Sequence, residues 1–258
     1  MNRILLVNLP TAAVASTPNF VMPLGILALA AYLAHHGIDG DFVDLNVHKD
    51  IRPYLQRKPE VVGLSVMIAG QFNEAYGICK LVKQMSPNST TVVGGAHVSQ
   101  FAEDIRNNCP EIDEVIVGEG EEKLFSLVTA EQAFCDVPFI KDVNTLPWPA
   151  YDLLNFEDYR RDYSTWNNPY NVDLGIRVPI VTSRGCPNHC NFCSVYKHMG
   201  SKYRAMDSVE VVDMLEWLCS YGARYFAFYD ANFTYNPKRV IDISNEIVRR
   251  NLKIHLDL

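Results

Sequence analysis

The feature that most constrains the fold is a regular alternation of strand-like apolar segments with helix-like segments, of which the first is itself apolar, in the first half of the chain. The apolar segments have the length of buried strands and lie at 3–8, 41–45, 61–66, 90–93 and 114–117. The intervening segments have a helical period and lie at about 24–36, 71–85, 101–108 and 121–129. Such alternation produces right-handed crossovers and a parallel sheet covered by helices on both faces. Residues 1–135 are therefore predicted to form a doubly wound α/β domain, with ligands bound over the carboxyl ends of its strands.

The same alternation restarts after an irregular stretch. Residues 136–177 are rich in proline and aromatic residues, which predicts a linker that packs against both neighbouring parts. Strand patterns return at 178–183, 224–229 and 253–258, with helices expected at 208–220, capped by Ser208, and at 237–250. Residues 178–258 thus predict the start of a parallel β/α barrel, with too few units to close it. We expect the chain to be a fragment of a longer protein or a truncated gene product.

Charge and hydropathy exclude several classes of protein. The formal net charge is −7, and no basic stripe is present, which argues against a general nucleic-acid binder. No apolar stretch reaches the roughly 20 residues needed to span a membrane. The N-terminus runs directly into the first strand pattern and lacks a signal-peptide cleavage pattern. A cytoplasmic location is therefore expected, where cysteines are thiols or metal ligands.

Three of the seven cysteines lie on one loop after the strand pattern at 178–183. They are Cys186, Cys190 and Cys193, with the spacing Cys-x-x-x-Cys-x-x-Cys. Gly185 and Pro187 bend the backbone so that three thiolates can converge on one inorganic centre. The hypothesis is an iron–sulfur cluster in which one iron lacks a protein ligand.

Two other interpretations of the loop stay open. A zinc site would need His189 or His198 as an additional ligand, although zinc sites usually combine two short ligand pairs. A redox pair formed by Cys190 and Cys193 would leave Cys186 unexplained. The remaining cysteines are scattered and are interpreted as ordinary core or surface residues; they are Cys79, Cys109, Cys135 and Cys219.

With Phe192 directly before its last cysteine, the loop resembles that of the radical S-adenosylmethionine superfamily. The resemblance implies a 4Fe-4S cluster bound by the three cysteines, whose fourth iron is chelated by S-adenosylmethionine and which yields a 5′-deoxyadenosyl radical. It places Phe192 against the adenine region. It also makes Asp230, which follows the next strand, the best candidate to hold the methionyl amine, although a simple turn residue remains the alternative. It assigns no catalytic side chain.

The first domain carries small residues at two strand ends. Ser65-Val66-Met67 follows the third strand pattern and Gly94-Gly95 follows the fourth, whereas no Gly-x-Gly-x-x-Gly follows the first, which argues against a dinucleotide site. This arrangement resembles cobalamin-binding domains, in which small residues admit the nucleotide tail against the sheet. The resemblance implies that Ser65, Met67, Gly94 and Gly95 contact cobalamin. The alternative is a domain that keeps the fold without the cofactor.

One cobalamin motif is missing. The loop after the first strand reads Asn8-Leu9-Pro10-Thr11, so Asp-x-His-x-x-Gly, whose histidine ligates cobalt from below, is absent. Many cobalamin-dependent radical S-adenosylmethionine enzymes also lack it. His97 is interpreted as a polar loop residue, with an approach to the corrin as the alternative. The acidic residues Glu119, Glu121 and Glu122 either bond to corrin amides or simply favour a helix N-terminus.

The whole chain resembles cobalamin-dependent radical S-adenosylmethionine enzymes. Pro23-Leu24-Gly25, Gly94-Gly95, the acidic turn at 118–121 and the cysteine loop occur in the order found there. The fold class implied is a flavodoxin-like doubly wound sheet of cobalamin-binding type, followed by a partial radical S-adenosylmethionine (β/α) barrel.

The activity implied is methyl transfer to an unactivated carbon, with methylcobalamin as the methyl source. Radical oxidative cyclisation, as in anaerobic porphyrin cyclase relatives, and a non-catalytic cobalamin- and cluster-binding module are the alternatives. The partners implied are a small-molecule substrate or biosynthetic intermediate and an electron donor such as flavodoxin or ferredoxin, without nucleic acid or a membrane span.

Overall fold

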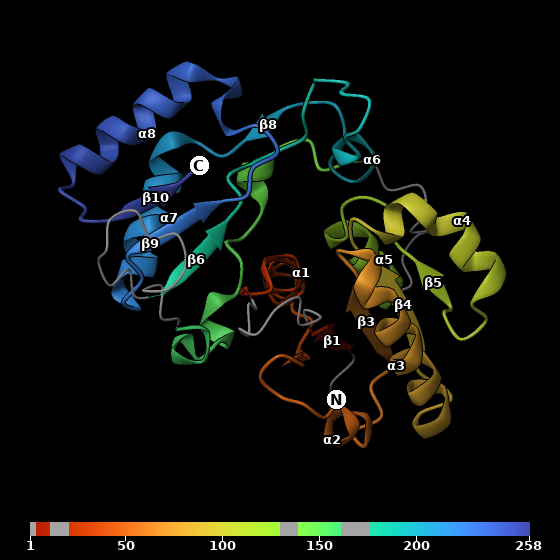
Figure 1. Ribbon diagram of the computed structural model, residues 1–258. Coiled ribbons are helices and arrows are strands. Elements are labelled where there is room, and N and C mark those ends of the chain that lie inside the picture. The colour runs from red at the N-terminus through yellow and green to blue at the C-terminus, as the bar shows by residue number, and fades with distance from the viewer. Residues whose placement is uncertain (1–3, 11–20, 130–138, 161–175) are drawn as a thin grey trace.

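The structure is a computed structural model that describes residues 4–10, 21–129, 139–160 and 176–258. Two α/β lobes lie side by side, with helix α1 between them (Figure 1). Within the described residues, the first lobe holds a five-stranded sheet and the second a three-stranded sheet, and a two-stranded hairpin lies near their contact.

The first sheet is parallel throughout and has the strand order β2-β1-β3-β4-β5. Its strands are β1 (Ile4–Asn8), β2 (Gly40–Asp44), β3 (Val61–Ser65), β4 (Thr90–Gly94) and β5 (Glu114–Val115). Because side chains alternate between the two faces of a strand, Leu5 and Val7 enter one core cluster while Ile4 and Leu6 enter another. Both faces are therefore apolar, as the predicted doubly wound domain requires.

Helices cover both faces of this sheet. They are α1 (Leu24–His35), α2 (Arg52–Leu55), α3 (Phe72–Met85), α4 (Val98–Asn108) and α5 (Glu121–Thr129), with a 3₁₀ turn at Ala69–Gln71. Helices α3 and α4 pack on the face that carries Leu5 and Val7, and α1 and α5 pack on the opposite face. The doubly wound prediction is thus confirmed, although the sequence patterns missed the single turn α2.

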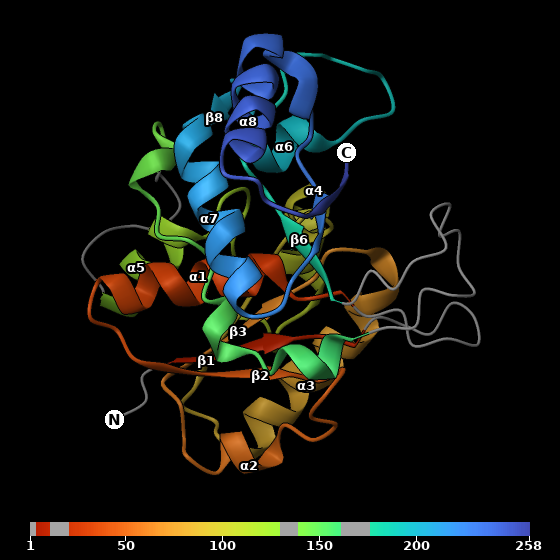
Figure 2. The same ribbon diagram turned by 90° about the vertical axis from the view of Figure 1, so that its left-hand side faces the viewer.

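Helix α1 is shared by the two lobes. Its sequence is apolar nearly all round, which is typical of a helix buried on more than one side. Ile26 and Leu33 pack on the first sheet, whereas Leu27 packs among residues of the second lobe such as Ile180 and Phe226. The views in Figures 1 and 2 agree that α1 lies between the two sheets. One helix therefore contributes to both cores and fixes the lobes against each other.

The second lobe repeats the strand–helix alternation. Its parallel strands are β6 (Arg177–Ile180), β9 (Tyr225–Phe228) and β10 (His255–Asp257), and its helices are α7 (Ser208–Ser220) and α8 (Pro237–Arg249), with a 3₁₀ turn at Phe233–Tyr235. The predicted cap at Ser208 is wrong. Ser208 is already the first helical residue, and the N-cap is Asp207, whose backbone is extended and whose side chain makes no capping hydrogen bond.

The described part of the linker, residues 139–160, contains three 3₁₀ turns. They are Val143–Thr145, Tyr151–Leu153 and Phe156–Tyr159. The Tyr151 hydroxyl donates to the Pro179 carbonyl at 2.6 Å in the second lobe, and the Tyr159 hydroxyl donates to Asp44 at 2.5 Å in the first. The linker therefore packs against both lobes; residues 136–138 and 161–175 of the predicted linker lie outside the described ranges.

Across the described ranges, each helix is too short or too polar to cross a membrane.

Candidate functional site

The cysteines lie in the loop of a short hairpin that we call the cluster hairpin, residues 183–205. Its two strands, β7 (Ser183–Arg184) and β8 (Arg204–Ala205), are antiparallel, and helix α6 (Val195–Met199) lies within the loop. Gly185 has φ +78°, and a side chain there would collide with the Lys202 carbonyl, so only glycine fits. The Cys186 amide donates to the Gly200 carbonyl at 3.2 Å, which closes the loop.

Among the described residues, the three cysteines of the loop form no disulfide bond. Cys186 and Cys193 are half-buried and Cys190 is exposed, and the Asn232 amide nitrogen lies 3.8 Å from the Cys186 sulfur. Within residues 4–10, 21–129, 139–160 and 176–258, no group of three or more His, Cys, Asp or Glu side chains is close enough to hold a single metal ion. In a 4Fe-4S cluster each cysteine binds a different iron, so the thiols stand around the cluster rather than meeting at one point.

Within the part of the chain that the structure describes, neither His189 nor His198 joins the cysteines in a group close enough to hold a single metal ion. Nδ1 of His198 lies 3.2 Å from the Ser194 carbonyl, and burial lowers the pKa of its imidazole. The His189 ring lies 6.4 Å from the Tyr196 ring. The loop therefore offers three thiols and no imidazole that converges with them. Such a donor set fits a three-cysteine cluster better than a tetrahedral zinc ion.

Phe192 lies beside the last cysteine and points into solvent. Its side chain is 93% exposed, and that of Tyr196, in the same loop, is 42% exposed. These exposed rings leave apolar surface beside the cysteines that a ligand can cover. The predicted contact of Phe192 with adenine stays a prediction.

Asp230 follows β9 and holds the beginning of the cluster hairpin. Its Oδ1 accepts hydrogen bonds from the Thr182 amide at 3.0 Å, from the Ser183 hydroxyl at 2.6 Å and from the Ser183 amide. Burial raises the pKa of Asp230 above its usual value, although the bonds from Ser183 and the charge of Arg239 oppose the shift. The sequence did not indicate this positioning contact. Among the described residues, Oδ2 accepts one bond of 3.2 Å, from the Thr182 hydroxyl that lies equally close to Oδ1, which leaves acceptor capacity on Oδ2.

The predicted cobalamin residues lie together at the carboxyl edge of the first sheet. Ser65 ends β3 and is paired with Gly94, which ends β4. Gly95 has φ +109°, and a Cβ there would lie 2.6 Å from the Val66 carbonyl, whereas a Cβ on Gly94 would have its nearest neighbour, Ile116, at 3.6 Å. Backbone and small residues thus line this edge.

Apolar side chains extend that edge towards solvent. Met67 and Ile68 are each about half exposed, and so is Phe101 of helix α4. The Gln71 side chain shapes the turn because it accepts from the Met67 amide at 3.0 Å. A narrow glycine-lined edge beside an exposed apolar surface fits a large ligand that carries a slender tail, as cobalamin does.

The acidic turn after β5 has partners that the sequence did not indicate. Oε1 of Glu121 lies 2.6 Å from Arg184 and Oε2 of Glu119 lies 2.9 Å from Arg204, so both ion pairs join the first lobe to the cluster hairpin. Burial raises the pKa of Glu121, but the charge and hydrogen bonds of Arg184 outweigh burial and lower it overall. These carboxylates therefore stabilise the hairpin, a role that neither interpretation of the acidic turn included.

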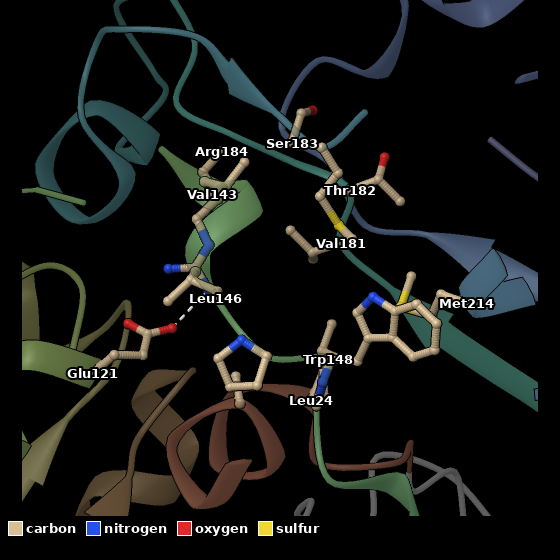
Figure 3. Close-up of a pocket in the computed structure, with 14 residues that line it drawn as sticks. Leu24, Glu121, Val143, Leu146, Trp148, Val181, Thr182, Ser183, Arg184 and Met214 are labelled. Carbon is tan, nitrogen blue, oxygen red and sulfur yellow. Dashed lines mark hydrogen bonds and ion pairs between the residues drawn. The ribbon is translucent and has the colours of Figure 1, made fainter. Parts of the chain in front are cut away.

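A small cavity of about 60 Å³ lies at the contact of the lobes. Glu121 and Arg184 face each other on one side of it, and Leu24 and Trp148 line the other (Figure 3). It has room for a few water molecules and is too small for a cofactor.

Comparisons with known proteins agree with both lobes. Residues 10–128 match the family described as B12 binding domain, and residues 180–258 match the radical SAM superfamily. An uncharacterized methyltransferase of Pyrococcus horikoshii is 32% identical over 90% of this chain and 53% of its own length. An anaerobic magnesium-protoporphyrin IX monomethyl ester cyclase of Cereibacter sphaeroides is 30% identical over 88% of this chain and 39% of its own length. The chain thus spans about half or less of these relatives.

Solved structures share the arrangement of the lobes. The radical S-adenosylmethionine methyltransferase TsrM from Kitasatospora setae, solved with cobalamin and a 4Fe-4S cluster, aligns with a TM-score of 0.71 at 19% identity, over 97% of this chain and 52% of that chain. The cobalamin-dependent enzyme OxsB aligns with a TM-score of 0.69 at 21% identity, over 98% and 38%. At this identity the likeness shows the fold. Together with the two family matches, it shows that the chain belongs to the radical S-adenosylmethionine superfamily, in the group whose members carry a B12-binding domain before the radical domain.

Proposed function

We propose that the chain is the cofactor-binding portion of a cobalamin-dependent radical S-adenosylmethionine methyltransferase. The observation that carries the proposal is the position of the cluster hairpin against the carboxyl edge of the first sheet. Gln100, in the first turn of α4, donates to the Ser194 hydroxyl at 3.2 Å, and Glu121, the first residue of α5, pairs with Arg184. Both helices begin at that edge, so the cysteines and the glycine-lined edge belong to one region.

The cysteines and Asp230 have distinct parts in this proposal. Cys186, Cys190 and Cys193 hold three irons of a 4Fe-4S cluster and leave the fourth iron for the amino and carboxylate groups of S-adenosylmethionine. Asp230 fixes Thr182 and Ser183 through Oδ1, and its Oδ2 would be the oxygen that accepts a hydrogen bond from the methionyl ammonium. When bound, the cluster supplies the electron that cleaves the sulfonium, and cobalamin supplies the methyl group. A one-electron donor such as flavodoxin or ferredoxin is the protein partner that this chemistry requires.

The first lobe would hold cobalamin without the histidine of the Asp-x-His-x-x-Gly motif, which its sequence lacks. The described part of the loop after β1 ends with Leu9 and Pro10, whose carbonyls accept from the Gln71 amide nitrogen. His97 packs among aromatic rings, 4.8 Å from Phe101 and 6.1 Å from Phe72, which favours a loop residue rather than a cobalt ligand. The Gly94-Gly95 edge takes the nucleotide tail.

Methyl transfer is preferred because methyltransferase is the activity named for the Pyrococcus relative and for TsrM. The relative from Cereibacter is named a cyclase, so radical oxidative cyclisation is the second candidate. The two reactions differ in their by-products. Both consume S-adenosylmethionine and one electron to give methionine and 5′-deoxyadenosine, whereas methyl transfer also consumes a second S-adenosylmethionine, releases S-adenosylhomocysteine and needs a second electron from the donor to return cobalamin to the state that accepts a methyl group.

The test measures both by-products. The protein is loaded anaerobically with iron, sulfide and cobalamin, and is then incubated with S-adenosylmethionine and a strong reductant. We expect 5′-deoxyadenosine and S-adenosylhomocysteine, with the first lost in Cys186→Ala and retained in the control Cys219→Ala, which changes a half-buried thiol outside the hairpin. Formation of 5′-deoxyadenosine without S-adenosylhomocysteine would contradict methyl transfer and favour the second candidate. A protein that holds cluster and cobalamin yet forms neither by-product would contradict radical chemistry.

A further inference from the structure

Four charged side chains meet where the lobes touch, and we call them the ion quartet: Glu119, Glu121, Arg184 and Arg204. The exposed fractions of these side chains are 7%, 6%, 17% and 5%, in that order. The two glutamates belong to the turn after β5 and the start of α5 in the first lobe, whereas the arginines belong to the cluster hairpin. Buried charges of this kind are stable only when paired, so the two lobes depend on each other here.

The two arginines place two positive charges side by side within the hairpin. Arg184 lies directly opposite Arg204 in the antiparallel register of β7 and β8. Like charges directly opposite each other destabilise a strand pair, and burial increases the effect. Glu119 approaches both guanidinium groups, at 3.3 Å from Arg184 and 2.9 Å from Arg204, and Glu121 approaches Arg184 at 2.6 Å. The carboxylates that neutralise the hairpin therefore come from the other lobe.

The quartet also reaches the backbone on both sides of the cysteines. Arg204 donates to the carbonyls of Met199 and Ile140, each at 2.5 Å, and Glu119 accepts from the Ile140 amide at 2.8 Å. Met199 ends the helix that follows the last cysteine. On the other side, Arg184 is separated from the first cysteine by Gly185 alone. Both ends of the cysteine loop are thus attached to the acidic turn of the first lobe.

We propose that Glu119 and Glu121 are positioning residues for the iron–sulfur cluster: from the B12-binding domain, they hold the hairpin in the conformation that presents the three cysteines. The inference rests on the proposed function for the identity of the cluster, but not for the coupling between the lobes. It implies that the first lobe, besides binding cobalamin, is needed to build the cluster site of the second. It also implies that the distance between the two cofactor sites is set by the quartet.

The experiment begins with the cluster-free chain, so that it does not depend on cofactor loading. Glu121→Gln keeps the shape of the side chain and leaves Arg184 with reduced compensation. Amide hydrogen exchange of residues 183–205 is then expected to accelerate on the order of 100-fold, because breaking a buried pair is strongly destabilising. Glu122→Gln is the matched control, since it removes the same charge one residue further along the same helix and leaves the quartet intact. It is expected to exchange like the native chain.

A double variant separates positioning from general destabilisation. Glu121→Gln combined with Arg184→Gln removes one charge of each sign and leaves Glu119 paired with Arg204. Hairpin exchange in this double variant is expected to be slower than in Glu121→Gln alone, because the uncompensated charge is gone. In the cluster-loaded protein, the rate at which a ferrous chelator removes iron is expected to be highest in Glu121→Gln and lower in the double variant.

Two results would overturn the proposal. One is equal hairpin exchange in Glu121→Gln and Glu122→Gln, and the other is additive acceleration in the double variant. If the native chain takes up no cluster, the proposed function fails, while the exchange measurements on the cluster-free chain still decide whether the quartet couples the lobes.

Discussion

The Ser183 hydroxyl donates a hydrogen bond of 2.6 Å to Oδ1 of Asp230, which joins the start of the cluster hairpin to the end of β9. The same oxygen accepts from the backbone and hydroxyl of Thr182. These groups donate to one carboxylate oxygen, whereas from the described residues Oδ2 accepts one bond of 3.2 Å, from the Thr182 hydroxyl that it shares with Oδ1. The two oxygens of one side chain can therefore be tested separately.

The first prediction uses Asp230→Asn and Asp230→Ala. The asparagine keeps one carbonyl oxygen that can accept from Thr182 and Ser183, so its free energy of unfolding is expected to stay within about 1 kcal/mol of the native value. The alanine leaves buried donors without an acceptor and is expected to lose about 2–4 kcal/mol. Urea unfolding measures both free energies. If the carboxylate also holds the methionyl ammonium, Asp230→Asn will weaken S-adenosylmethionine binding, measured by calorimetry, without loss of stability.

The second prediction concerns pH. Burial raises the pKa of Asp230 above the usual 3.8, so the folded protein holds this proton more tightly than the unfolded chain does. Stability contributed by the protonated form is present below the usual pKa and is lost as pH rises through the raised one. Relative to Asp230→Asn, which does not titrate, the native chain should therefore lose stability as pH rises from below the usual pKa of an aspartate through the raised pKa of Asp230. A difference that moves in the opposite direction would show that hydrogen bonding outweighs burial.

The third prediction compares adjacent glycines. Gly95→Ala forces a positive φ on alanine and places its Cβ 2.6 Å from the Val66 carbonyl, so a loss of at least about 1–3 kcal/mol is expected. Gly94→Ala meets Ile116 at an ordinary 3.6 Å and should fold normally. Because it narrows the edge that takes the nucleotide tail, it should still weaken cobalamin binding, measured by absorption titration. Native affinity in a folded Gly94→Ala protein would place the tail elsewhere.

The fourth prediction ranks the thiols. Burial, with a contribution from Asp113, raises the pKa of Cys79 to about 12, so this thiol is protonated and inaccessible near neutral pH. Cys190 is exposed and should be alkylated first in the cluster-free chain, as peptide mass spectrometry would report. Cluster loading should protect Cys186, Cys190 and Cys193 and leave Cys79 unchanged. Equal labelling of Cys190 before and after loading would argue against its role as a ligand.

Much of the fold could be predicted because its signals are local. The apolar strands of the first sheet and the period of helices such as α3 are visible within windows of a few residues, and so is the spacing of Cys186, Cys190 and Cys193. The apolar sequence of α1 was also visible, although the sequence did not show that this helix joins the two lobes. The short strands β7 and β8 leave no periodic signal because each has only two residues.

The contacts that shape the site depend on how the two lobes pack against each other, and they could not be predicted from the sequence. Glu121 and Arg184 are separated by 63 positions, and Glu119 and Arg204 by 85. Asp230 and Ser183 are separated by 47. No local pattern specifies such pairs. The one sequence feature that pointed to these contacts was the pair of arginines on either side of the cysteine loop. Two like charges that become buried need acidic partners from elsewhere in the chain.

The most direct measurement is the count of iron and sulfide bound after anaerobic reconstitution, taken together with the absorption spectrum. A cluster held by Cys186, Cys190 and Cys193 predicts about four irons and four sulfides per chain and a brown chromophore, all lost in Cys190→Ala and kept in Cys219→Ala. A single tightly bound zinc ion without the brown chromophore would contradict it.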